Sequence, residues 1–95
     1  MDKRRKAAAL KYNPKEAAAP KVVAKGSGWL ADKILEVAKE HRIPLRQDPQ
    51  LVEVLSAIDL NREIPPELYK AVAEILAFVY KMTKKELREL PTSRS

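Results

Sequence analysis

The chain has 95 residues, with 19 Lys and Arg against 13 Asp and Glu, a net charge of +6, 45% apolar residues and no cysteine. This length allows one small domain, and the apolar content is too high for a disordered tail. The lack of cysteine excludes disulfides and thiolate metal sites, and suits a reducing cytosol. No apolar run approaches the roughly 20 residues of a membrane-spanning helix, and no signal peptide is evident. The sequence predicts a cytoplasmic domain.

The positive charge lies at the two ends of the sequence. Residues 1–25 hold eight bases and two acids, residues 26–80 hold six bases and nine acids, and residues 81–95 hold five bases and two acids. The tightest cluster lacks the aromatic and amide side chains that are typical of nucleic-acid recognition. This cluster, the basic leader, consists of Lys3, Arg4, Arg5 and Lys6. We expect residues 1–6 to be disordered and solvated, with contact to acidic lipid or nucleic acid as the alternative.

Two strands are predicted in the first third of the chain. Residues 7–12 are short and end before Asn13-Pro14, which favours a strand, although their three alanines would also suit a helix. Residues 21–25 are β-branched in the middle and are closed by Gly26-Ser27-Gly28, which predicts a second strand.

A helix and a third strand are expected next. Residues 29–41 predict a helix, because Leu30, Ile34, Val37 and Ala38 have the spacing of one buried face. Residues 43–46 predict a short strand at a sheet edge, where Pro44 is tolerated. Strand, helix and strand would then form a βαβ unit with a parallel strand pair.

Two further helices are predicted in the second half. Asp48 is expected to cap a helix that begins at Pro49. Pro65-Pro66 precedes an amphipathic segment over residues 67–82, and a short helix and a frayed tail are expected over residues 83–95. The predicted fold is therefore an α/β domain over residues 7–82, with a mixed sheet of about three strands and three to four flanking helices.

No catalytic, metal or cofactor site is predicted. His41, the only histidine, ends a helix, where a cation is favoured by the helix dipole. Gly26-Ser27-Gly28 resembles an anion-binding loop, but it lacks the Lys-Ser/Thr of a P-loop, and Asp32 would repel a phosphate.

Four ordered blocks resemble the C-terminal cytoplasmic domain of the FlhB/YscU/SpaS family of type III secretion. The blocks are Ala-Leu-Lys-Tyr at 9–12, Ala-Pro-Lys-Val-Val-Ala-Lys-Gly at 19–26, Ala-Lys-Glu-His-Arg-Ile-Pro at 38–44, and Glu-Ile-Pro-Pro-Glu-Leu-Tyr-Lys-Ala-Val-Ala-Glu-Ile-Leu-Ala at 63–77. They cover most of the predicted domain in the same order as in the family.

The chain departs from this family at its self-cleavage motif. The family's Asn-Pro-Thr-His aligns with residues 2–5, where the sequence is Asp-Lys-Arg-Arg. Asn13-Pro14 follows the first strand and is succeeded by Lys15-Glu16 rather than Thr-His. The sequence also has nothing that corresponds to the family's membrane-spanning part. We expect a free-standing domain that is not an enzyme.

The resemblance implies a non-catalytic interaction module of flagellar export, which binds export substrates or export components and modulates substrate switching. It assigns an apolar substrate patch to Ala19, Pro20, Ala73 and Leu76, although the last two could equally belong to the core. Tyr69, Phe78 and Tyr80 are expected to pack against the sheet or its rim.

Two further partners follow from the same comparison. Relatives have a strand where this chain has only residues 1–6, so an open sheet edge could accept a strand from another chain. The basic leader could hold the domain at the acidic inner face of the membrane, at about 1 kcal/mol per base. From the charge alone, the alternative function is a small basic nucleic-acid-binding protein.

Overall fold

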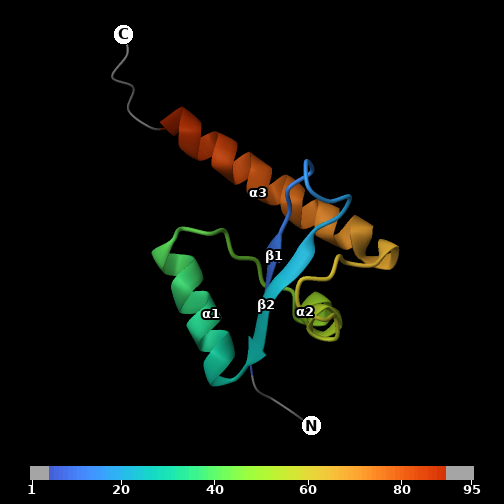
Figure 1. Cartoon of the computed structure of the whole chain (residues 1–95). Coiled ribbons are helices and arrows are strands. Elements are labelled where there is room, and N and C mark those ends of the chain that lie inside the picture. The colour runs from blue at the N-terminus through green and yellow to red at the C-terminus, as the bar shows by residue number, and fades with distance from the viewer. Residues whose placement is uncertain (1–4, 90–95) are drawn as a thin grey trace.

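The computed structural model describes residues 5–89, with side chains described for residues 5–82. It has an α/β fold in which α1 and α2 flank two central strands and α3 crosses one end of them (Figure 1). The elements are β1 (Lys6–Lys11), β2 (Lys21–Ser27), α1 (Trp29–Glu40), α2 (Pro49–Ser56), the 3₁₀ turn η1 (Pro66–Leu68) and α3 (Tyr69–Glu89). The predicted fold class is thus confirmed, and its sheet needs correction.

The sheet consists of β1 and β2, which pair antiparallel with Ala7 opposite Gly26. A register shift after Ala9 sets Leu10 opposite Val22. Ala7 is buried, whereas Leu10 on the other face packs against the core. The central cluster of that core consists of Ala19, Val22, Leu51, Leu55, Ile64 and Val72.

The third strand and the βαβ unit predicted from the sequence are wrong. Residues 43–48 have no regular structure, and Ile43 is 54% exposed. The N–H of Ile43 donates to the Ala38 carbonyl at 2.8 Å and closes α1, with Arg42 at a positive φ of 55°. Pro44 has no N–H to offer a sheet. The segment therefore ends a helix instead of extending the sheet.

A different segment covers the outer edge of β2 at its start. Val22 donates to the Arg62 carbonyl at 3.1 Å and accepts from Asn61 at 2.7 Å, while Ile64 donates to the Pro20 carbonyl at 2.9 Å. This stretch of edge is therefore closed to strand addition by another chain. For β1, residues 5–89 provide backbone hydrogen bonds from β2 alone, so strand addition stays a prediction for the outer edge of β1.

Helices α1 and α2 begin where the sequence predicts. Asp48 accepts a hydrogen bond from the Leu51 N–H at 3.1 Å, and Pro49 is the first residue of α2. The buried face of α1, however, is centred on Ala31 and Ala38, and Leu30 is exposed. Small residues lie against the strands because they allow close approach of the helix to the sheet.

Helix α3 continues to Glu89, past the boundary that the sequence predicts at Met82. Val72 is 1% exposed in its first half. Contrary to expectation, Tyr80 is 67% exposed, and Phe78 is half-exposed beneath the guanidinium of Arg46, 5.8 Å from the ring centroid. The predicted tail over residues 90–95 and the first four residues of the leader lie outside the described residues.

Candidate functional site

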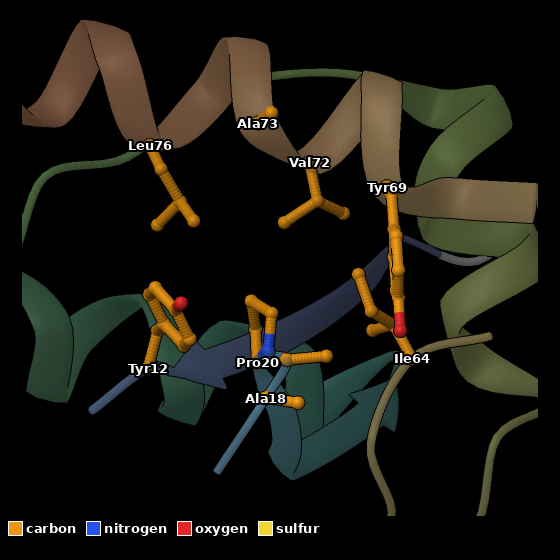
Figure 2. Close-up of a pocket in the computed structure, with 9 residues that line it drawn as sticks. Tyr12, Ala18, Pro20, Ile64, Tyr69, Val72, Ala73 and Leu76 are labelled. Atoms are coloured by element: carbon orange, nitrogen blue, oxygen red, sulfur yellow. The ribbon is translucent and has the colours of Figure 1, made fainter. Parts of the chain in front are cut away.

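A pocket of about 210 Å³ lies between the first half of α3 and the connection from β1 to β2. Figure 2 shows its two walls, with α3 on one side and Tyr12, Ala18 and Pro20 on the other. It is lined by Tyr12, Ala18, Ala19, Pro20, Ile64, Tyr69, Val72, Ala73 and Leu76. The four residues that the sequence resemblance places in a patch are therefore brought together on one pocket.

The α3 wall follows from helical spacing. Tyr69, Val72, Ala73 and Leu76 are separated by three or four residues, so their side chains emerge on one face of the helix. Val72 is buried and forms the base of this wall, whereas Ala73 is exposed. Leu76 is half-buried, and it packs against the core as well as lining the pocket.

The opposite wall is set by the turn that follows β1. The side-chain oxygen of Asn13 accepts from the Lys15 N–H at 3.0 Å, and its carbonyl accepts from Glu16 at 2.9 Å and Ala17 at 3.1 Å. This turn sends the chain back toward β2 and leaves Pro20 buried at the start of that strand. The Ile64–Pro20 backbone hydrogen bond then fixes Ile64 beside the pocket.

The pocket lining is uncharged and mostly aliphatic, with two half-exposed tyrosines, Tyr12 and Tyr69. Ala18, Ala19 and Ala73 leave the space that larger side chains would fill. Apolar cavities of about 150 Å³ can hold benzene, so this pocket has room for one large apolar side chain. Tyrosines at a rim offer ring faces and hydroxyl groups to the backbone of a ligand.

The sequence missed several of these lining residues. Tyr69 could have been found, because it precedes Ala73 and Leu76 at helical spacing. Tyr12 and Ile64 carry no local signal, since their place in the pocket depends on the turn at Asn13 and on the pairing of residues 61–64 with β2.

The basic residues near the N-terminus are partly used by the fold. Arg5 forms an ion pair with Asp32 at 3.1 Å, and Lys6 forms one with Glu53 at 2.8 Å. Lys25 donates to the carbonyls of Ser56 at 3.0 Å and Ile58 at 2.6 Å, at the end of α2. Arg5 and Lys6 of the basic leader therefore belong to the fold, while Lys3 and Arg4 lie outside the described residues.

Neither a membrane span nor a metal cluster is found within residues 5–89. None of the helices there has the length and apolar content needed to cross a bilayer. The same residues contain no group of three acidic, histidine or cysteine side chains placed to hold a metal ion.

Residues 4–79 match the protein family described as FlhB HrpN YscU SpaS Family. Over 80 residues the chain is 50% identical to the flagellar biosynthetic protein FlhB of Aquifex aeolicus (strain VF5), covering 83% of this chain and 23% of that protein. Over 78 residues it is 42% identical to the uncharacterized protein YlqH of Bacillus subtilis (strain 168), covering 82% of this chain and 84% of that protein. The chain thus spans less than a quarter of the Aquifex FlhB and most of the length of YlqH.

The fold is similar to solved cytoplasmic domains. The crystal structure of the cytoplasmic domain of FlhB from Shewanella putrefaciens matches with a TM-score of 0.82 at 35% identity, covering 95% of this chain and 72% of that one. The crystal structure of the PscU C-terminal domain matches with a TM-score of 0.71 at 30% identity, covering 77% of this chain and 94% of that one.

Proposed function

Because the chain belongs to the FlhB HrpN YscU SpaS family, we propose that it is a non-catalytic interaction module of flagellar type III export. In this role it binds segments of export substrates or export components in the cytoplasm and modulates substrate switching. The observation that carries the proposal is the gathering of Ala19, Pro20, Ala73 and Leu76 on one pocket.

The ligand that suits this pocket is a peptide segment with one large apolar side chain. Full burial of such a side chain contributes about 1.5–3 kcal/mol, and ordering the peptide opposes binding. A single shallow anchor therefore gives weak and rapidly reversible binding. Such binding is suited to a protein that must release each substrate to the export machinery.

A pocket-filling substitution tests the proposal. Ala73→Phe places a ring in the pocket from an exposed position, so the fold should be kept while the ligand is excluded. Ala77→Phe is the matched control, because Ala77 is exposed on the same helix and lies outside the pocket lining. We expect Ala73→Phe to weaken binding of a flagellar export substrate at least about tenfold by fluorescence anisotropy, and Ala77→Phe to leave it unchanged. Equal binding by both variants would contradict the proposal.

The absence of catalysis is part of the proposal. Asn13, the only asparagine before a proline, is followed by Lys15-Glu16, and its side chain takes part in an ordinary turn. The chain is expected to keep its full mass of 10.8 kDa on long incubation, as measured by mass spectrometry. A stable pair of fragments split after Asn13 would show self-cleavage instead.

A further inference from the structure

An exposed tryptophan stands at the end of the molecule where α1 begins. Trp29 is 78% exposed and its neighbour Leu30 is 44% exposed. Trp29 is the only tryptophan in the chain. It neither packs into the core nor lines the pocket described above.

The local backbone presents these two side chains outward. Gly28 has φ 60° and ψ −126°, a conformation that favours glycine, and it turns the chain from β2 into α1. Leu30 lies on the bare backbone of Gly26, where an added Cβ would come within 2.4 Å of the Leu30 Cγ. The position of Leu30 thus depends on Gly26, and Trp29 precedes it at the tip of the helix.

The charge around this tip is neutral to positive. Asp32 is paired with Arg5 at 3.1 Å, and Glu36 is paired with Lys33 at 3.5 Å. The Gly28 N–H donates to the Arg5 carbonyl at 2.7 Å, so the start of the chain lies beside the tip. Residues 2–4 add two bases and one acid.

The tip lies at the opposite end of the strands from the pocket. β1 runs from Lys6, beside Gly28, to Lys11, beside the pocket residue Tyr12, and β2 returns the other way (Figure 1). Six or seven residues of strand span about 20 Å. A surface bound at the tip would therefore leave the pocket open.

We infer that this tip, formed by Trp29 and Leu30 with Lys3 and Arg4, docks on an anionic phospholipid bilayer. Tryptophan favours the boundary between lipid headgroups and acyl chains, and each Lys or Arg near an anionic membrane surface strengthens binding about fivefold. The two carboxylates nearest the tip are already paired with bases, so they oppose this attraction little. The pocket would then face the cytoplasm while the domain is held at the membrane.

The single tryptophan makes the inference directly measurable. Vesicles of phosphatidylcholine mixed with phosphatidylglycerol should shift Trp29 emission to shorter wavelength, with binding that weakens as salt is raised, and vesicles of phosphatidylcholine alone should not. Replacing Lys3 and Arg4 by Ser should weaken binding about fivefold for each base. These two positions are chosen because Arg5 and Lys6 are needed for ion pairs in the fold.

Vesicle sedimentation provides the matched comparison of side chains. Trp29→Ala should lower binding about tenfold or more, because the loss of one large apolar side chain removes most of the insertion. Tyr80→Ala is the control, since Tyr80 is 67% exposed but lies on α3, away from the tip. Equal losses for the two variants, an unshifted emission with the anionic vesicles, or equal binding to both vesicle types would overturn the inference. Binding of export substrate to vesicle-bound protein should be unchanged, which separates this test from that of the pocket.

Discussion

Lys25 on β2 is expected to be one of the most important charged residues for stability. Its ammonium group donates to the Ser56 and Ile58 carbonyls at 3.0 and 2.6 Å. The last carbonyls of a helix have no partner within the helix, and the helix dipole is negative there. A lysine at this point joins α2 to the sheet and satisfies both carbonyls at once.

Lys25→Met keeps the aliphatic part of the side chain and removes the ammonium group. Hydrogen bonds to a charged group contribute about 1.5–3 kcal/mol. The two bonds share one ammonium group that is only half-buried, so we treat them as a single contribution of that size. We therefore expect the free energy of unfolding to fall by about 1.5–3 kcal/mol, a large part of the 5–15 kcal/mol typical of a small domain.

Urea unfolding monitored by circular dichroism measures this loss. Lys11→Met is the control, because Lys11 ends β1 at an exposed position and should cost less than about 0.5 kcal/mol. If both variants unfold at the same urea concentration, water must satisfy the α2 carbonyls equally well, and the reasoning fails. Substrate binding by folded Lys25→Met should be unchanged, since Lys25 does not line the pocket.

Two backbone predictions concern the ends of α1. Arg42 has φ 55° where the Ile43 N–H bonds back to Ala38 at 2.8 Å, a helix ending that favours glycine, so Arg42→Gly should raise stability by about 1 kcal/mol; a loss of stability in thermal unfolding would contradict this. Gly28→Ala should lower stability by at least about 1 kcal/mol because of its φ of 60°, and an unchanged melting temperature would show that the strain is relieved by local movement.

Local capping chemistry explains which elements the sequence could predict. Asp48-Pro49 gives the start of α2 correctly, because the capping carboxylate and the helix it caps are only three residues apart. The segment 43–46 could not be judged in the same way. Alternating apolar residues around Pro44 suit an edge strand or an exposed loop equally, and only the availability of a sheet edge decides between them.

Alanine shows the same limit at the candidate site. Ala31 and Ala38 are buried against the strands, whereas Ala73 is exposed and lines the pocket. All three are small apolar residues on amphipathic helices, so periodicity cannot separate a core alanine from a pocket alanine. The patch was predictable through resemblance to a family, and its extension to Tyr12 and Ile64 depends on long-range pairing.

Long-range pairing also changes the meaning of the charge. The bases of residues 1–25 seem continuous in sequence, but β1 separates Arg5 and Lys6 from Lys11 by about 20 Å. Arg5 and Lys6 are each held by a carboxylate 27 or 47 residues away. Binding of nucleic acid through the remaining leader bases, Lys3 and Arg4, would give a salt dependence near two phosphate contacts, a slope of about −2 in log K against log salt. A slope near −6 or steeper for labelled DNA would require a continuous basic surface that this arrangement of the strands does not provide.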